Sequence, residues 1–378
     1  MHYSRRDFLH LLSAGGIAAV LCACSRAPTP NARSGLIIGG GQFIDPKFPQ
    51  KKQYTLALAD TNQPQPKLID IPFLPHGVAF SKQTPNRMAV FEKIGPGACE
   101  VDIKKGEMLR VIEKHPKRFF YGHGAFSSDH NLLFSTETVL DSQQGMIAVR
   151  DAKTHELLGE FPTYGDSPHD CRLIDQGSVL LITNGGGARG SHKRPSVTYV
   201  DVNTQQLLER IEIDNDYLNA GHVARAQNGS IAVVSAPRKG LDETNLGGVS
   251  LRHGKANELI SMREPQDVIE RMRGEALSVS IHEESGIVAV THPNGNMVTF
   301  WSIAENRFLA SLDFERPRGV TQSVDRSRFV LSYGQSASLV EIDVDSLKLI
   351  PDTVKHATYI TGSHIYNWDS EIGATEPA

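Results

Sequence analysis

The sequence is poor in cysteine, in tryptophan and in uninterrupted apolar runs. Its 378 residues include four Cys and two Trp, and aromatic residues make up 7%. Four cysteines are too few to hold a chain of this length together as a disulfide scaffold. Hydrophobic residues reach only 39%, which excludes a polytopic membrane protein.

The chain also lacks an excess of positive charge and the common catalytic motifs. Lys and Arg number 39 against 43 Asp and Glu, so the net charge of −4 gives no reason to expect nucleic-acid binding. The sequence has no Gly-x-Ser-x-Gly elbow, no Cys-x-x-Cys-His haem site and no His-Glu-x-x-His zinc motif. What it has instead is 33 Gly and 20 Pro, which indicate a soluble, globular chain with many turns.

Residues 1–23 read as an export signal. The stretch Ser4–Leu9 contains Arg5-Arg6 and fits the twin-arginine pattern. A modestly apolar segment follows as far as Leu21, too short and too polar for a transmembrane helix. We therefore expect the twin-arginine export machinery to carry the chain into the periplasm.

The signal ends in a pattern that resembles a bacterial lipobox, Leu21-Cys22-Ala23-Cys24. It predicts cleavage before Cys24 and lipidation of that residue. Each buried CH₂ of an acyl chain contributes about 0.8 kcal/mol, so several chains would hold the protein on a membrane. An ordinary cleavage site with an incidental Cys is the alternative. Residues 24–34 read as a tether.

The rest of the chain repeats with a period of about 50 residues. One recurring element is an apolar strand that ends in a polar turn, usually at an Asp; copies begin at Val101, Arg150, Val200, Trp301 and Ile342. A second element begins at residues 76, 123, 169, 222, 277 and 318. Each unit reads as four short strands, and such units arranged radially form propeller blades.

The sequence therefore predicts an all-β, seven-bladed β-propeller over residues 35–372, followed by a tail over 373–378. Three strands at the front, Gly35–Gly40, Tyr54–Ala59 and Lys67–Ile71, have no fourth partner of their own. The C-terminal strand near Gly362–Tyr366 should complete their blade and leave no open edge. Pro265–Arg273 reads equally well as a short helix or a loop.

Histidines recur at the start of the second element. His76, His123, His169 and His222 stand there in four consecutive units, and His364 lies near the same phase in the closing unit. That place is the start of the innermost strand, beside the central channel, so the rings should converge. Convergent imidazoles suit a transition metal, and iron or copper is the expectation.

Polar residues nearby could support these rings. Tyr121, Asp170 and Arg172 could orient the imidazoles or bind an anion. Two other interpretations stay open. The histidines could simply cap strands by bonding carbonyl groups, or they could hold an anionic ligand together with Arg118, Arg172 and Arg318.

Three segments, Arg118–Ser127, Gly145–Phe161 and Ser167–His169, resemble a bacterial family known as domain of unknown function 1513. The resemblance extends over about Gly35 to Asp369. It implies a twin-arginine-exported β-propeller of the YVTN type without a settled activity, often encoded beside iron-uptake or imelysin-like proteins. Family members carry Glu where this chain has Asp170.

Together these features predict a lipid-anchored periplasmic binding protein. It would be non-catalytic, would hold a metal or metal complex at the His-lined channel mouth, and would associate with iron-uptake proteins. A periplasmic metalloenzyme or oxidoreductase that uses the same histidines is one alternative. A protein-interaction scaffold, in which exposed loops such as Pro237–Gly248 matter more than the channel, is another.

Overall fold

The computed structural model describes residues 35–373 except 45–46, 48 and 61–62. The expected signal peptide and tether, with Arg5, Arg6 and Cys24, lie outside the described residues, as does nearly all of the expected tail. No helix in the described ranges is long and apolar enough to cross a membrane.

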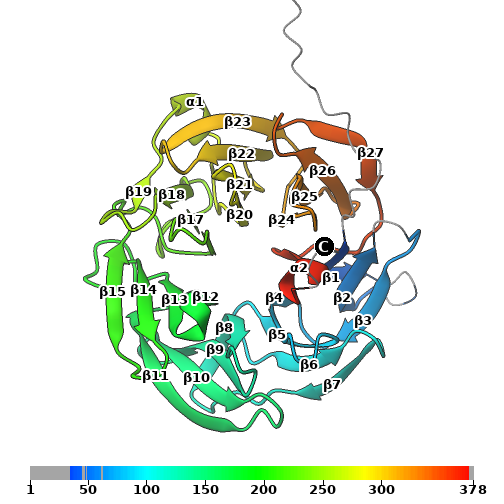
Figure 1. Ribbon diagram of the computed structural model, residues 1–378, viewed down its shortest axis with the longest axis vertical. Helices are drawn as coiled ribbons and strands as arrows, with labels where there is room; N and C mark the ends of the chain where they lie inside the picture. The colour runs from blue at the N-terminus through cyan, green and yellow to red at the C-terminus, as the bar shows by residue number, and fades with distance from the viewer. Residues whose placement is uncertain (1–34, 45–46, 48, 61–62, 374–378) are drawn as a thin grey trace, which may run out of the picture. The chain divides into compact units, whose positions relative to one another are not determined.

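The described residues form seven four-stranded antiparallel sheets, arranged as blades around a central axis (Figure 1). Blade 1 consists of β28 (Ile365–Asn367), β1 (Leu36–Ile44), β2 (Lys52–Asp60) and β3 (Lys67–Ile71). Blade 2 consists of β4 (Pro75–Phe80), β5 (Arg87–Glu92), β6 (Ala98–Asp102) and β7 (Glu107–Val111). Blade 3 consists of β8 (Arg118–Phe126), β9 (Leu132–Val139), β10 (Gln144–Asp151) and β11 (Leu157–Asp166).

The remaining four blades follow in chain order. Blade 4 consists of β12 (Pro168–Ile174), β13 (Val179–Asn184), β14 (Ser196–Asp201) and β15 (Leu207–Glu212). Blade 5 consists of β16 (Val223–Arg225), β17 (Ile231–Ser235), β18 (Gly248–Arg252) and β19 (Ile260–Ser261). Blade 6 consists of β20 (Val279–His282), β21 (Ile287–His292), β22 (Met297–Ser302) and β23 (Arg307–Asp313). Blade 7 consists of β24 (Val320–Gln322), β25 (Arg328–Tyr333), β26 (Ser338–Asp343) and β27 (Leu349–Lys355).

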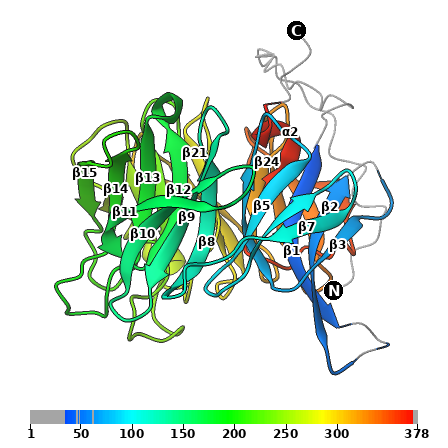
Figure 2. The same ribbon diagram turned by 90° about the horizontal axis from the view of Figure 1, so that it is seen from below.

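Blade 1 closes the ring as the sequence predicts. The strand β28, from the C-terminal end, pairs antiparallel with β1, with Ile37 opposite Asn367 and Gly39 opposite Ile365. The Leu36 backbone N–H also donates to Asp369 Oδ2 at 3.0 Å. In side view, β1 and β2 extend beyond the other strands of their blade (Figure 2). The closure is confirmed, because β28 supplies the fourth and innermost strand of blade 1.

The expected Asp turns are confirmed in their hydrogen bonds. The carboxylates of Asp102, Asp151, Asp201 and Asp343 each accept from the backbone N–H groups that follow. In the copy that begins at Trp301, Ser302 replaces the Asp, and its hydroxyl accepts from the Glu305 N–H at 3.3 Å. A side-chain oxygen at this point closes the turn between the third and fourth strands of a blade.

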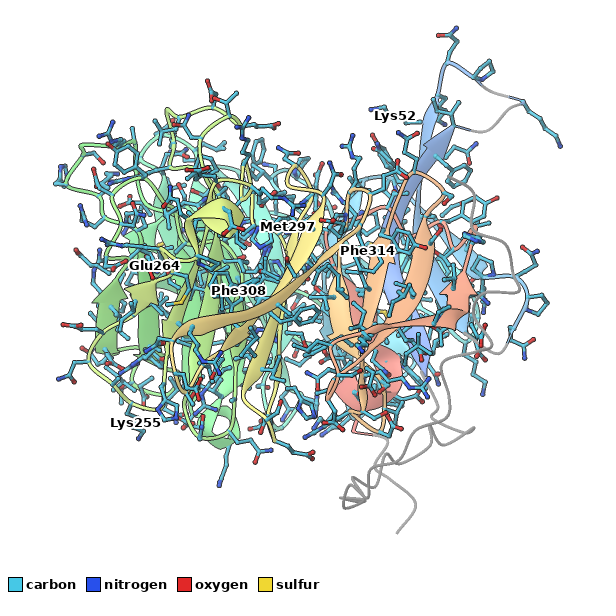
Figure 3. The ribbon with its side chains drawn as sticks, turned by 90° about the horizontal axis from the view of Figure 1, so that it is seen from above. Lys52, Lys255, Glu264, Met297, Phe308 and Phe314 are labelled. Carbon is cyan, nitrogen blue, oxygen red and sulfur yellow. The ribbon has the colours of Figure 1, made fainter. Side chains whose placement is uncertain are left out.

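Apolar side chains are buried between neighbouring blades. In the described residues, seven clusters of buried side chains each draw on two adjacent blades. Between blades 2 and 3, for example, the rings of Phe91 and Phe120 lie 5.8 Å apart. Trp301 is fully buried in blade 6. Phe308, labelled in Figure 3, packs against it with the two ring centroids 5.4 Å apart. Each blade is thus stabilised by burial against both neighbours.

The described residues also contain three short helical turns. Of the helix and the loop that remained open for Pro265–Arg273, the structure shows a helix, α1 (Gln266–Ile269). A second helix, α2 (Trp368–Glu371), was not expected; its Trp368 Nε1 donates to the Pro85 carbonyl at 2.9 Å and ties the closing segment to blade 2. The third is the 3₁₀ turn η1 (Asp175–Gly177). Cys99 and Cys171 lie on different blades, and both are buried free thiols.

Candidate metal centre

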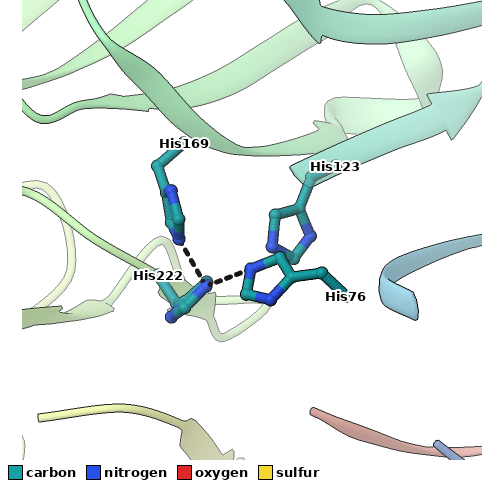
Figure 4. Close-up of side chains that lie close together, drawn as sticks. All are labelled: His76, His123, His169 and His222. Atoms are coloured by element: carbon teal, nitrogen blue, oxygen red, sulfur yellow. Dashed lines mark hydrogen bonds between the residues drawn. The ribbon is translucent and has the colours of Figure 1, made fainter. Parts of the chain in front are cut away.

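Five blades direct a histidine toward the channel. His76, His123 and His169 lie on the innermost strands β4, β8 and β12, while His222 and His364 directly precede β16 and β28. All five are buried, with 2% to 8% of each residue exposed. Figure 4 shows four of the rings meeting near the axis. The structure therefore brings together all five histidines that the sequence singled out.

The histidines do not stand in strictly equivalent positions. Four backbone N–H groups make the same bond to a hydroxyl on the neighbouring strand, those of His123, Asp170, Ser278 and Gly319. Asp170, and not His169, thus occupies the position in its blade that His123 occupies in blade 3. His169 stands one residue earlier. Register shifts between Phe120 and Gly124, and between Pro168 and Cys171, make this possible, because an irregular strand can turn successive side chains to one side.

Three imidazole nitrogens crowd the Nε2 atom of His222. The Nε2 atoms of His169, His364 and His76 lie 2.7, 2.8 and 3.2 Å from it. Its other nitrogen, Nδ1, lies 2.7 Å from the Leu277 carbonyl oxygen. A carbonyl only accepts, so Nδ1 carries the proton and the Nε2 of the neutral ring presents a bare lone pair. One lone pair can accept one hydrogen bond, which leaves two of the three close approaches unsatisfied.

His123 presents a second unsatisfied nitrogen. Its Nδ1 lies 3.5 Å from Asp170 Oδ1, while its Nε2 is buried and has no hydrogen-bond partner among the described residues. The other oxygen of Asp170 accepts from the Val223 N–H at 3.1 Å, which fixes the carboxylate. A carboxylate on one ring nitrogen and a free lone pair on the other is the usual arrangement of a metal-binding histidine.

Burial keeps the imidazoles neutral. It lowers the pKa of His76, His169, His222 and His364 well below the ordinary 6.5. Repulsion between neighbouring imidazoles adds to the effect in each case, and Lys93 adds to it for His76, His169 and His364. The pKa of His123 is also lowered by burial, although Asp170 opposes the shift. Metal binding requires neutral imidazole, so at neutral pH these rings need give up no proton.

The ring nitrogens fit a transition metal. One nitrogen from each of His76, His123, His169 and His222 falls within a group no wider than 4.8 Å. Tetrahedral zinc with Zn–N bonds near 2.0–2.1 Å would place its nitrogens about 3.3 Å apart, so a small adjustment would suffice. An all-imidazole set suits zinc, copper, iron or nickel and disfavours calcium and magnesium.

The imidazole cluster lies between two cavities. His169 lines the first, of about 410 Å³, together with Tyr121 and Arg318; we call it the Arg318 cavity. His123, His222 and His364 line the second, of about 230 Å³, together with Arg172; we call it the Arg172 cavity. Ligands could therefore reach the rings from two sides.

The polar residues that were expected to support the histidines lie partly beside the imidazoles and partly in the two cavities. Asp170 contacts His123, and Arg172 Nε lies 3.7 Å from Asp170 Oδ2. Arg118 is not part of the site: it lines neither cavity, and its guanidinium pairs with Glu160 at 2.5 Å. The expectation that Arg118 helps to hold an anion with the histidines is therefore wrong, because a closer carboxylate on β11 neutralises it.

Two residues of the site escaped sequence reasoning. Lys93, just after β5, and Glu275, before β20, form an ion pair at 3.0 Å, and both line the Arg318 cavity. They come from blades 2 and 6 and lie 182 residues apart in the chain. Neither stands at a recurring position of the repeat, so the sequence carried no signal for them.

Comparisons with known proteins agree with the fold. No curated protein sequence matches the chain. The solved structure of hydrazine synthase from Kuenenia stuttgartiensis is similar at a TM-score of 0.63 and 13% identity, over 86% of this chain and 99% of that one. A chain of the mitotic checkpoint complex is similar at a TM-score of 0.53 and 12% identity, over 88% of this chain and 87% of that one. Such low identities show a shared fold alone. The family model described as "Protein of unknown function (DUF1513)" matches residues 69–365, so the chain belongs to this family.

Proposed function

We propose that the protein binds a transition metal through its five channel histidines. The observation that carries the proposal is the approach of three Nε2 atoms to the Nε2 of His222, whose Nδ1 proton is committed to the Leu277 carbonyl. Hydrogen bonds can satisfy only one of these contacts. A metal ion would use every lone pair at once.

The isolated Nε2 atom of His123 supports the same conclusion. A histidine that served only to cap a strand would bond a carbonyl, as His222 does through Nδ1. His123 instead keeps a buried nitrogen without a partner among the described residues. Leaving a buried polar atom unpaired costs about 1–3 kcal/mol, and a metal ligand would not bear that cost.

The test is the metal content of the exported protein. Untagged protein should be purified from cells grown with iron, copper and zinc, and its metal measured by mass spectrometry. We expect close to one equivalent in the natural protein and in the exposed-histidine control His253→Ala. The variants His123→Ala and His169→Ala should lose the metal while remaining folded. A natural protein with no metal, and with no gain in thermal stability when metals are added, would refute the proposal.

A binding role is favoured over catalysis, although one observation supports an enzyme. The five rings are at least nine-tenths buried, and the chain lacks the common catalytic motifs. However, His169 lines the Arg318 cavity, so a second molecule could meet the metal there. A metalloenzyme or oxidoreductase is thus the second candidate. Redox cycling of the bound metal by a small reductant and oxidant, with turnover, would favour it.

We further propose that this binding takes place at the cell envelope, on a membrane-anchored protein associated with iron acquisition. Support comes from the twin-arginine and lipobox patterns and from the family resemblance in the sequence. The change Cys24→Ala should move the protein from the membrane fraction to the soluble periplasm. The change of Arg5 and Arg6 to Lys should block export. Export without change in the Lys variant would contradict the twin-arginine route.

A further inference from the structure

The Arg318 cavity has the size and lining of a small-molecule site. Its volume of about 410 Å³ falls in the usual range for ligand pockets. Tyr121, Asn219 and Arg318 supply polar groups, and Ala220 and Leu241 supply apolar wall. This cavity is distinct from the metal centre itself, which it meets only at His169.

Arg318 offers unused hydrogen-bond donors to this cavity. Its Nε donates weakly to the Gly362 carbonyl at 3.4 Å. Neither Nη1 nor Nη2 has a hydrogen-bond partner in the part of the chain that the structure describes, and no carboxylate lies within ion-pair distance of them there. A guanidinium whose two Nη groups are both free can donate two parallel hydrogen bonds to the oxygens of a carboxylate.

A second cation of the cavity, Lys93, already has a carboxylate partner there. Lys93 Nζ lies 3.0 and 3.3 Å from the two oxygens of Glu275. Burial lowers the pKa of Arg318, and the charge of Glu275 offsets only part of that shift. Lys93 therefore has a carboxylate within ion-pair distance, whereas Arg318 has none among the described residues.

Three further charged residues line the cavity: Asp242, Glu243 and Arg316. Asp242 uses its carboxylate within its own turn, where it accepts from Thr244 and Asn245. Glu243 and Arg316 are both exposed and carry opposite charges. In formal charge the lining is therefore balanced, and the group it leaves without a close carboxylate partner is the guanidinium of Arg318.

We propose that the Arg318 cavity binds a small organic acid through one carboxylate group, held by Arg318 and Lys93. The two free Nη groups of one guanidinium match the two oxygens of one carboxylate. Tyr121 and Asn219 would orient the remainder of the molecule, which would lie on the His169 side of the metal centre. This inference goes beyond the proposed function, because Arg318 and Lys93 do not require a metal in order to bind the acid.

The test is calorimetric titration of the full exported protein, both as purified and after treatment with a chelator. The probes are acetate, pyruvate and succinate, with inorganic phosphate and the neutral acetamide as comparisons. We expect saturable binding of at least one carboxylate, and Arg318→Gln should weaken it about tenfold or more, as loss of a charge-assisted hydrogen bond does. The matched control Arg307→Gln, an exposed arginine of blade 6 that lines neither the Arg318 cavity nor the Arg172 cavity, should leave the affinity unchanged.

Three outcomes would overturn the proposal: no carboxylate binds saturably, Arg318→Gln binds as tightly as the natural protein, or phosphate binds more tightly than every carboxylate. The metal content of each variant, measured in parallel, separates this proposal from the proposed function. A metal-free protein that binds an acid through Arg318 would refute the metal alone. A metal-loaded protein that binds no acid would refute this inference alone.

Discussion

At the scale of single residues, the site is governed by which ring nitrogens carry protons. The Leu277 carbonyl fixes the tautomer of His222, and Asp170 is placed to fix that of His123. The sequence predicted these histidines because their repeat positions are visible in it. It could not predict their tautomers, since Leu277 lies 55 residues from His222 and only the folded chain brings the two together.

Asp170 offers a substitution that separates orientation from folding. In Asp170→Asn, the amide oxygen can still accept from the Val223 N–H, so the link between blades 4 and 5 should survive. The loss of negative charge beside His123 should weaken metal binding about 10- to 100-fold. Competition with a chelator of known affinity measures the effect, and thermal unfolding checks the fold. Unchanged metal affinity would show that the carboxylate does not support His123.

The buried rings also predict how stability changes with pH. In the unfolded chain these histidines protonate below about pH 6.5, whereas in the folded, metal-free protein their lowered pKa keeps them neutral. The unfolded state therefore binds more protons, and stability should fall as pH drops below 6.5. The upper limit is about 1.4 kcal/mol per ring per pH unit. Urea unfolding of chelator-treated protein at pH 7.5 and 5.5 measures it; equal stability at both would contradict the burial of neutral rings.

At the scale of strands, irregular backbone places the rings. Short strands and Asp turns were predictable because they depend on local alternation and on one turn residue. The one-residue offset between His123 and His169 was not, because the register shifts in β8 and β12 have no marker in the sequence. The helix α2 was also missed, since four residues after the last strand carry too weak a pattern.

Glycine at position 122 is required where β4 and β8 approach. Its φ of +103° disfavours any other residue, and an added Cβ would lie 2.7 Å from His76 Cδ2. We expect Gly122→Ala to destabilise the protein by about 2 kcal/mol or more and to displace His76. The control Gly159→Ala, on β11, meets nothing within 4 Å and should be close to neutral. Chemical unfolding measures both; equal stabilities would show that the backbone at 122 is not constrained.

At the scale of the whole molecule, the ring depends on one short strand. The count of seven blades and the closing pair were predictable, because the repeat length divides the chain and leaves three strands at the front without a fourth. The ion pair between Lys93 and Glu275 was not, because blades 2 and 6 become neighbours across the channel only when the ring is closed. Long-range pairs of this kind are the part of the site that local patterns cannot reveal.

Removal of β28 should open the ring. A chain truncated after His364 loses the partner of β1 and the α2 contact between Trp368 and the Pro85 carbonyl, although it keeps all five histidines. We expect a large loss of thermal stability and rapid proteolysis within blade 1. Truncation after Gly373 should behave like the full chain. Equal protease resistance of the two truncated chains would contradict the role of β28 as the closing strand.

The most direct test of metal binding is a crystal of the exported protein measured at the absorption edges of iron, copper and zinc. We predict one anomalous peak within bonding distance, about 2.0–2.3 Å, of His222 Nε2 and of at least two other channel histidines. Density that shows these rings in contact with one another or with water alone, with no anomalous peak among them, would contradict it.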